Sequence, residues 1–430
     1  MAAHAGDSPA RALASEIVSC LRERGHVAYF AGGCVRDELL GLPPSDYDVA
    51  TDATPDRVRE LFPRSSEVGK CFGVVIVQGR GEVVEVATFR SDGAYSDSRR
   101  PDSVTFSTPE EDAKRRDFTV NALFLDPFGD GELNPADLPR RPLSGCVIDL
   151  VGGVADLRAG VLRAVGDAAQ RLAEDHLRAL RAVRLASRLG FEIESRTALA
   201  IARDAASLRG VSRERIGEEV HRMMMHGSRA ACAERLAALG LLAPVLGHDT
   251  PPSASHAPPA CWDHLAALPP EVPYPASLAA WGLDLCLTDG EAEWPTAWRR
   301  ALCLSNHDRD GLAAVLRASG QVRLAWAGLS VAGRKRLAAR SWFEWARVLV
   351  GVRDPALAAR VGLDRDGLAA TASGLAPVPL LGGDDLVAAG WKPGPRFKEV
   401  LDRVYDAQLD EKIRTRAEAL ELAWALGVKA

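Results

Sequence analysis

The sequence predicts an α+β protein, in which a small mixed α/β domain at the N-terminus is followed by an elongated all-α remainder. Short apolar runs of β-type composition, separated by turn residues, occur within residues 1–145. After about residue 167, apolar residues recur at helical spacing almost to the end. Ala, Leu and Arg are frequent, which favours helix over most of the length. Because 430 residues exceed one ordinary core, we expect roughly two to four domains.

The N-terminal domain is expected to contain one helix followed by several short strands. Pro9 opens the helix and Gly25 ends it. A turn at Gly79–Gly81 between two β-rich runs predicts a hairpin. The predicted strands cover residues 27–30, 47–50, 73–77, 82–89 and 118–125. Further along, residues 250–275 are rich in Pro, Ala and His, which predicts a loop or linker.

Composition limits the class of protein and its location. The formal net charge is −5, so an RNA partner would have to be held by local basic patches. The eight cysteines form no C-x-x-C pair, which predicts reduced thiols rather than a zinc site or a disulfide framework. The sequence shows no signal-peptide core at its start and no apolar run of about 18 residues. These features predict a cytoplasmic protein without a membrane span.

A glycine pair followed by two acids forms the densest motif in the sequence. Gly32 and Gly33 follow a predicted strand and precede a helix start, where free N–H groups and a bare backbone suit a phosphate. Arg36 could then reach a triphosphate oxygen. Asp46 and Asp48 are two residues apart, and on a strand both carboxylates point to one face.

The acids predict a magnesium site for phosphoryl transfer. Carboxylates beside a triphosphate can hold two ions about 3.5–4 Å apart, which stabilise the attacking and leaving oxygens, and Mg²⁺ suits such sites. Glu85, flanked by Val84 and Val86 on another predicted strand, is the candidate third carboxylate. Taken singly, a Gly-Gly is most often a turn and a D-x-D is most often a solvated loop. Their occurrence within 17 residues, between two predicted strands, makes the signal specific.

Two further basic segments stand out. Residues 115–122, Arg-Arg-Asp-Phe-Thr-Val-Asn-Ala, enter a predicted strand with their charges first. Residues 174–184 predict one continuous helix in which charged residues recur every three positions. These charged residues are Asp175, Arg178, Arg181 and Arg184. In isolation, such a helix is more often a solvated surface laced with nearly neutral Asp–Arg pairs.

Together, these motifs resemble the class II CCA-adding tRNA nucleotidyltransferases and the bacterial poly(A) polymerases. The matching patterns are G-G-x-x-R-D-x-L-L-G at 32–41, D-x-D-x-A-T-D-A-x-P at 46–55, R-R-D-F-T-V-N-A at 115–122 and E-D-x-x-R at 174–178. The resemblance implies a nucleotidyltransferase fold for the head of the protein. It covers the first half of the chain strongly and the rest loosely.

The resemblance also implies roles for single residues. Asp46 and Asp48 would be the magnesium ligands, and Gly33, Arg36 and Arg116 would contact the incoming nucleotide. The substrates implied are CTP, ATP and the acceptor arm of tRNA. No obligate protein partner is evident.

The E-D-x-x-R segment would read the base. Cytosine and adenine each present an amino donor beside a ring-nitrogen acceptor, whereas uracil and guanine present the reverse order. A carboxylate at Asp175 next to a guanidinium at Arg178 matches the first order and opposes the second. Such a mismatch in a dry site can discriminate by about 10⁴ or more. Arg181 and Arg184 would suit phosphate or ribose contacts.

The resemblance divides the chain into four parts. These are a catalytic head at 1–145, a helical neck with the nucleotide-selecting helix at 146–222, a helical body at 223–340 and a helical tail with tRNA contacts at 341–430. Residues 130–146 are longer than the family pattern and predict a surface insertion. Residues 149–157 resemble the family's hinge, and residues 213–219 resemble a motif that braces the pocket.

The predicted function is template-independent addition of C, C and A to the tRNA 3′ end. Residues 90–101 resemble the flexible loop of enzymes that add the terminal A, which enzymes that stop after CC lack. The nearest alternatives are an A-adding enzyme that completes CC-ended tRNA, and a poly(A) polymerase. Two remoter alternatives are a non-catalytic RNA-binding protein on the same scaffold and a small-molecule adenylyltransferase.

Overall fold

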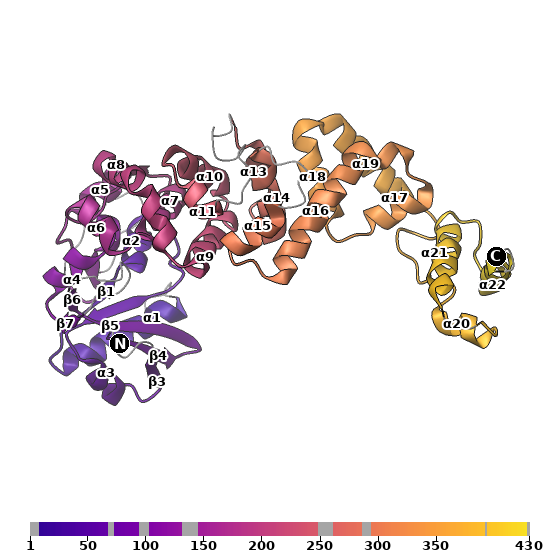
Figure 1. Ribbon diagram of the computed structural model, residues 1–430. Helices are drawn as coiled ribbons and strands as arrows, with labels where there is room; N and C mark the ends of the chain where they lie inside the picture. Colours follow the sequence, from indigo (N-terminus) through magenta and orange to yellow (C-terminus); the bar gives the residue numbers. More distant parts are fainter. Residues whose placement is uncertain are drawn as a thin grey trace. The chain divides into compact units, whose positions relative to one another are not determined.

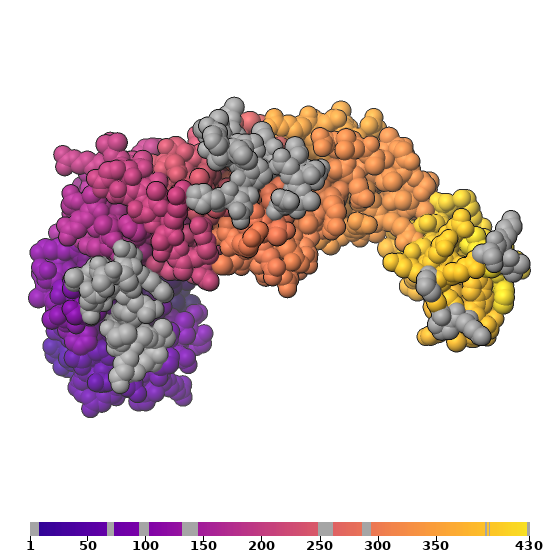
Figure 2. All heavy atoms as spheres, in the orientation of Figure 1, coloured from indigo at the N-terminus to yellow at the C-terminus, as the bar shows by residue number. Residues whose placement is uncertain are grey.

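The computed structural model describes residues 8–67, 73–93, 103–130, 145–247, 261–285, 294–391 and 394–427. The chain forms two compact units, coloured by position along the sequence in Figures 1 and 2. Unit 1 consists of Met1–Glu219 and Arg235–Val245, and unit 2 of Val220–Glu234 and Leu246–Ala430. The chain therefore passes from one unit to the other three times. The expected division into four parts stays a prediction.

Unit 1 is built around a seven-stranded sheet in the order β3-β4-β5-β2-β1-β8-β9. The strands are β1 (Ala28–Ala31), β2 (Asp48–Thr51), β3 (Ser65–Glu67), β4 (Val74–Gly79), β5 (Glu82–Thr88), β8 (Phe124–Asp126) and β9 (Cys146–Ile148). Neighbouring strands are antiparallel except β2 and β5, which run parallel. Two smaller sheets pair β6 (Arg90–Asp92) with β7 (Val104–Phe106) and β10 (Val161–Leu162) with β11 (Glu192–Ile193).

The helices of unit 1 surround this sheet and then form a helical segment of their own (Figure 1). They are α1 (Pro9–Glu23), α2 (Gly33–Leu39), α3 (Pro55–Leu61), α4 (Pro109–Arg115), η2 (Thr119–Asn121), α5 (Gly153–Ala159), α6 (Ala168–Glu174), α7 (Arg178–Leu189), α8 (Ser195–Arg203), η4 (Ala205–Gly210), α9 (Arg213–Met224), α10 (Arg229–Ala238) and α11 (Leu242–Leu246), the last three extending to or across the boundary with unit 2. The mixed α/β head followed by helices confirms the predicted fold class.

Local chemistry explains the main elements of the head. The Ser8 hydroxyl accepts a hydrogen bond from the Arg11 amide at 3.2 Å, which caps α1 as expected from the Pro9 start. The predicted hairpin is confirmed, because Arg80 and Gly81 both adopt positive φ and connect the antiparallel strands β4 and β5. Phe89 and Phe124 meet edge to face in the apolar core beneath the sheet.

The strand predicted at 118–125 is wrong over most of its length. Residues 119–121 form a 3₁₀ turn, and only Phe124 and Leu125 of the predicted run lie in β8. The Asp117 carboxylate accepts a hydrogen bond from the Phe118 amide at 2.8 Å and another from the Asn121 side chain at 3.1 Å. These local bonds favour a turn over an extended strand.

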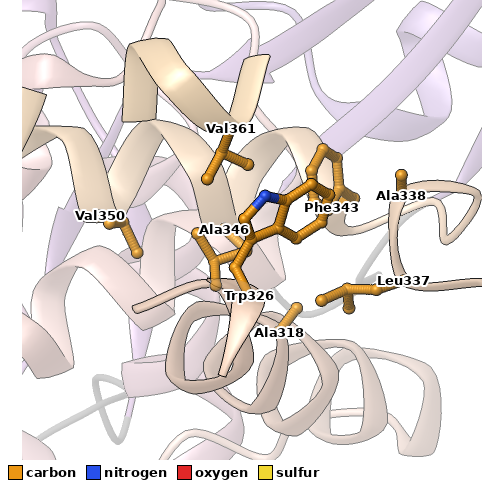
Figure 3. Close-up of a cluster of buried hydrophobic side chains, with 9 residues drawn as sticks. Ala318, Trp326, Leu337, Ala338, Phe343, Ala346, Val350 and Val361 are labelled. Atoms are coloured by element: carbon orange, nitrogen blue, oxygen red, sulfur yellow. The ribbon is translucent and has the colours of Figure 1, made fainter. Parts of the chain in front are cut away.

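Within its described residues, unit 2 is helical. Besides parts of α9 and α10, it contains α13 (Asp263–Ala267), α14 (Tyr274–Asp284), α15 (Trp294–Ala301), α16 (Asn306–Leu324), η5 (Trp326–Gly328), α17 (Val331–Ala338), α18 (Phe343–Arg353), α19 (Pro355–Ala369), α20 (Gly383–Ala388), α21 (Pro395–Leu409) and α22 (Arg416–Gly427). Trp326 and Phe343 pack together in one of its apolar clusters, with Val361 and Leu337 beside them (Figure 3). Helix α13 lies within the predicted 250–275 linker, so that prediction is wrong for its second half.

One buried cation organises the start of unit 2. The Arg229 side chain is 1% exposed, and its guanidinium donates hydrogen bonds to backbone carbonyl groups. These belong to Met224, Leu268, Pro269 and Pro270, at 2.8–3.2 Å. Since a buried guanidinium needs acceptors, this contact ties the chain before α10 to the chain after α13.

Two other features concern the described ranges only. None of their helices is both long and apolar enough to cross a lipid bilayer. Their six cysteines form no disulfide with one another.

Candidate active site

The two acids of the first motif meet a third at the centre of the sheet. Asp48 begins β2 and lies in register with Glu85 on the parallel strand β5. Asp46 precedes β2 by two residues and is exposed, so the expectation that both acids lie on the strand is wrong for Asp46. Asp48 is partly buried, and Glu85 is exposed. We call Asp46, Asp48 and Glu85 the acidic edge.

The acidic edge raises the pKa of one of its carboxyl groups. Burial, followed by the charges of Asp46 and Glu85, raises the pKa of Asp48 to about 7, while Arg116 opposes the rise. Because the charges of Asp46 and Glu85 act on Asp48, the three acids predicted from the sequence lie close together. A divalent cation beside them would remove the repulsion, so the donor set fits Mg²⁺ chemically. Within the described ranges, no three His, Cys, Asp or Glu side chains already converge as a metal cluster.

Tyr47 anchors the segment that carries the two aspartates. It is 4% exposed, and its ring packs edge to face on Phe30 at 5.4 Å. Its hydroxyl donates a hydrogen bond to Glu38 at 2.6 Å, and Arg11 of α1 donates to the same carboxylate oxygen at 2.8 Å. The side chain between the two acids is therefore fixed inward.

The glycine pair forms the turn between β1 and α2. Gly32 has φ +76°, a conformation that glycine adopts without strain, and its amide donates to the Leu123 carbonyl at 3.0 Å. A Cβ atom there would lie 3.0 Å from the Arg116 guanidinium. Gly33 then begins α2. The bare backbone of this turn thus lets Arg116 approach closely.

Arg36 lies deeper than the sequence suggested. Its side chain is 4% exposed, and its guanidinium donates to Asp37 at 2.8 Å and to the Asn121 side chain at 2.5 Å. These bonds make it part of the framework under the turn, so a direct contact with a triphosphate stays a prediction.

Arg116 lies close enough to the acidic edge to act on Asp48, and its predicted contact with the nucleotide stays a prediction. It donates to Asp112 at 2.9 and 3.0 Å and to the Asn121 carbonyl at 3.2 Å, and its guanidinium lies 5.0 Å from the centre of the Phe124 ring. Asp112 is 1% exposed. Burial favours a raised pKa for Asp112, but the charges and hydrogen bonds of Arg116 and Arg115 together outweigh it and hold the pKa below the ordinary range. The Arg116 charge is therefore firmly positioned and lowers the pKa of Asp48.

The segment predicted as one helix over 174–184 is broken in the structure. Helix α6 ends at Glu174, Asp175 adopts an extended conformation, and α7 begins at Arg178. The Asp175 carboxylate accepts hydrogen bonds from its own Leu177 amide at 3.1 Å and from Arg215 at 2.7 Å. This side chain competes for a local amide, which interrupts the helix.

The arginines of this segment each have a separate carboxylate partner. Arg178 donates to Glu174 at 2.6 Å rather than to Asp175. Arg181 donates to Asp117 at 2.6 and 2.8 Å, and Arg184 to Glu219 at 2.6 Å. The carboxylate partners of Arg178, Arg181 and Arg184 are therefore Glu174, Asp117 and Glu219, in that order. Arg178 therefore pairs with Glu174, and its predicted arrangement beside Asp175 stays a prediction.

The predicted hinge packs tightly against the 3₁₀ turn. The Asp149 carboxylate accepts hydrogen bonds from the amides of residues 151–154 at 2.9–3.2 Å, which caps α5. A Cβ on Gly153 would lie 2.3 Å from the Thr119 carbonyl oxygen, so only glycine fits. Thr119 in turn donates to Asp156 at 2.7 Å. Whether the segment rotates stays a prediction.

A cavity of about 410 Å³ lies between β6, α4 and α6. Its lining includes Lys114, Arg115 and Arg171 together with Glu111 and Glu174. The lining adjoins predicted site residues in the chain but does not include the acidic edge. Residues 94–102, most of the predicted flexible loop, and residues 131–144 of the predicted insertion lie outside the described residues.

Sequence reasoning missed three residues that organise the site. Asp112 holds Arg116, Arg188 of α7 donates to Asp37 at 3.1 Å, and Arg171 donates to the carbonyls of residues 114 and 115. Arg188 had a detectable signal, because it follows Arg181 by seven residues and so shares a helix face with it. Nothing in the sequence points to the other two.

The fold and the site resemble a polymerase-type nucleotidyltransferase head joined to a helical segment. Residues 28–163 match the poly A polymerase head domain, and residues 190–251 match the probable RNA and SrmB-binding site of polymerase A. Over the residues they cover, these matches confirm the resemblance to the CCA-adding tRNA nucleotidyltransferases and bacterial poly(A) polymerases.

Two curated relatives illustrate the similarity. The CCA-adding enzyme of Lactiplantibacillus plantarum is 45% identical over 213 residues, 49% of this chain and 48% of the relative. That of Geobacillus stearothermophilus is 42% identical over 226 residues, 52% of each chain. The aligned part thus spans about half the length of these curated relatives.

Solved structures extend the similarity to the whole chain. The Bacillus stearothermophilus CCA-adding enzyme in complex with CTP has a TM-score of 0.78 and 28% identity, covering 98% of this chain and 99% of that one. The Thermotoga maritima CCA-adding enzyme complexed with tRNA-CCA has a TM-score of 0.68 and 20% identity, covering 98% and 96%. The second likeness shows a shared fold.

Proposed function

We propose that this protein is a template-independent CCA-adding tRNA nucleotidyltransferase that adds C, C and A from CTP and ATP. The observation that carries the proposal is the acidic edge beside Arg116, where burial and like charges raise the pKa of Asp48. Such an excess of negative charge suits a divalent cation and a triphosphate. The named relatives, several of them CCA-adding enzymes, support this reading.

The reaction forms one phosphodiester bond and releases pyrophosphate. The oxygen of the RNA 3′-hydroxyl bonds to the α-phosphorus of CTP or ATP, the bond from that phosphorus to the bridging oxygen breaks, and the hydroxyl proton passes to water. Mg²⁺ held by Asp46 and Asp48 would neutralise the triphosphate and activate the hydroxyl. Glu85, in register with Asp48, would orient the Asp48 carboxylate or supply a third ligand. Arg116 would contact the nucleotide close to these acids.

Asp175 and Arg178 are the proposed base-reading pair. The guanidinium of Arg178 has five N–H donors, more than its bonds to Glu174 and to backbone carbonyls use. Arg215 holds the Asp175 carboxylate at 2.7 Å, which fixes its orientation. A fixed acceptor next to a fixed donor would accept cytosine and adenine and reject uracil and guanine.

Gly32, Gly33 and Arg36 would support the phosphates from beneath the turn. Arg181 and Arg184 would hold the nucleotide-selecting helix through their carboxylate partners, in place of the predicted phosphate or ribose contacts. The helices of unit 2 would grip the acceptor arm of tRNA. Because that substrate is cytoplasmic, we propose a cytoplasmic location.

Extension of two tRNA substrates tests the proposal. Purified protein with Mg²⁺, CTP and ATP should extend tRNA ending at the discriminator base by C, C and A, and tRNA ending in CC by A. Extension of the CC-ended tRNA alone would identify an A-adding enzyme, and long A tails would identify a poly(A) polymerase. Either result would overturn the proposal.

A matched pair of variants tests whether the acidic edge is the reaction centre. Asp48→Asn should abolish pyrophosphate release, whereas Asp52→Asn, an exposed acid just past the same strand, should leave it near the wild-type rate. Equal rates in both variants would show that the acidic edge is not the reaction centre. Absence of Mg²⁺-dependent pyrophosphate release from the wild type with several RNAs would instead indicate a non-catalytic RNA-binding protein.

A further inference from the structure

A closed ring of hydrogen bonds joins helix α7 to the glycine turn and to the 3₁₀ turn. Starting from α7, Arg188 donates to Asp37 at 3.1 Å, and Arg36 donates to the same carboxylate at 2.8 Å. The ring continues to η2 and returns to α7. Its members, in order, are Arg188, Asp37, Arg36, Asn121, Asp117 and Arg181. We call these six side chains the α7 ring.

Asn121 is the link that closes the α7 ring. Its side-chain oxygen accepts from Arg36 at 2.5 Å, and its side-chain nitrogen donates to Asp117 at 3.1 Å. An amide is suited to this place, since it offers an acceptor to the cation and a donor to the anion. An aspartate there would face the Asp117 carboxylate with a like charge, and an alanine would remove one hydrogen-bond partner from each neighbour.

The α7 ring reaches the helix at two points. Arg181 and Arg188 are seven residues apart, so they lie on one face about 10 Å apart along the axis. One engages the segment before η2 and the other engages α2. Two separated attachments fix both the position and the direction of a helix, which a single ion pair would not do.

Three of the six ring side chains are removed from solvent. Asp37 is 2% exposed, Arg36 is 4% exposed and Asp117 is 9% exposed. Buried ionic groups are costly to leave unpaired, so the loss of one member destabilises the arrangement of the others. The α7 ring is therefore a unit rather than a set of independent surface pairs.

The α7 ring connects the two ends of the proposed nucleotide site. On one side, the Asn121 carbonyl also accepts from Arg116, which acts on Asp48 of the acidic edge. On the other side, α7 carries Arg178 of the proposed base-reading pair one turn before Arg181. The ring thus spans from the phosphate end of the site to the base end.

We propose that Asn121 and Arg188 are positioning residues that hold α7 at a fixed distance from the glycine turn, so that selection of C and A over U and G depends on them. This inference rests on the proposed function for its substrates. It assigns no contact with nucleotide to either side chain, because each acts through the ring.

Arg188→Met is the first variant, because it removes one ring bond while keeping a long apolar stem. The incorporation efficiency, kcat/KM, for CTP and ATP should fall between about tenfold and a hundredfold, as expected for misplacement of a substrate-positioning element. The efficiency for UTP and GTP should fall less, so discrimination shrinks. Arg188→Lys, which can still reach Asp37, should restore most of the discrimination. The control is Arg203→Met, an exposed arginine of α8 outside the ring.

A double-mutant cycle tests whether the ring acts as one unit. Among the described residues, Asn121 and Arg188 are linked through Arg36 and Asp37 on one side of the ring and through Asp117 and Arg181 on the other. If the ring is a unit, Asn121→Ala combined with Arg188→Met should lose little more discrimination than the worse single variant. A loss equal to the product of the two single losses would overturn the proposal.

Two readouts separate this inference from the proposed function. Equilibrium binding of CTP and UTP without RNA should show a reduced preference for CTP in Arg188→Met, and unchanged preference would refute the inference. Hydrogen exchange of the α7 amides, which does not depend on catalysis, should rise in Arg188→Met and not in Arg203→Met. Unchanged protection would refute the ring even if the wild-type protein extends no tRNA.

Discussion

Replacing Asp117 with Asn should destabilise unit 1 in a pH-dependent way. Burial favours a raised pKa for this carboxyl group, but Arg181 and the Asn121 side chain outweigh it and lower the pKa from 3.8 to about 2. At about 1.4 kcal/mol per pH unit, this difference corresponds to about 2 kcal/mol of stability near neutral pH.

The direction in which stability changes with pH follows from the lowered pKa of Asp117. A carboxyl group with a lower pKa in the folded state stabilises that state above about pH 4, and the stabilisation is lost as the pH falls through about 2. The difference in unfolding free energy between wild type and Asp117→Asn should therefore be about 2 kcal/mol at pH 7 and about half of that at pH 3. The Asn side chain also leaves Arg181 without its anion, which adds to the loss at neutral pH.

Thermal unfolding of unit 1, followed by circular dichroism between about pH 3 and pH 7, measures this difference. Asp56→Asn, whose side chain is 84% exposed on α3, is the control and should follow the wild type throughout. A gap between wild type and Asp117→Asn that is equal at both ends of the pH range would refute the reasoning, because a permanently neutral or permanently charged group gives no pH dependence.

Three other substitutions have expected outcomes. Gly153→Ala places a methyl group 2.3 Å from the Thr119 carbonyl oxygen, so the melting temperature should fall by an amount corresponding to about 1–3 kcal/mol; a wild-type melting temperature would contradict the close approach. Arg229→Met leaves buried carbonyl groups without a donor and should cost about 3 kcal/mol in urea unfolding monitored by tryptophan fluorescence; an unchanged midpoint would be inconsistent with it. Tyr47→Phe removes the bond to Glu38 but keeps the ring packing, so calorimetry should show a loss of about 1 kcal/mol, and a loss several times larger would indicate a wider role.

The order of elements in the head was largely predictable from sequence. The β-rich runs are short, and glycine punctuates them, as at the Gly79–Gly81 hairpin. The errors arose where a polar side chain competes with regular backbone bonding. Asp117 accepts a hydrogen bond from the amide of the next residue and favours a 3₁₀ turn over a strand. Asp175 accepts one from the Leu177 amide and interrupts the predicted helix between α6 and α7.

The predicted site residues stay predictions, and the partners that the structure gives them could not be read from the sequence. The spacing of Asp46 and Asp48 predicted neighbouring carboxylates, and the strand register adds Glu85 as expected. The partner of Arg181 lies 64 residues away in sequence, and that of Arg188 lies 151 residues away. Such pairs depend on how the helices pack against the sheet, which a periodic pattern does not specify.

The three passages of the chain between the units restrict where evolution or an engineer can exchange domains. Residues 235–245 belong to unit 1, where Arg235 donates to the Phe191 carbonyl at 3.0 Å and Arg213 donates to the Pro244 carbonyl at 2.9 Å. A crossover at residue 222, the predicted end of the neck, would replace this returning segment, Arg235 included, with a foreign one and change the segment whose carbonyl Arg213 binds. Chimeras of two relatives should therefore fold only when the joint falls after Val245.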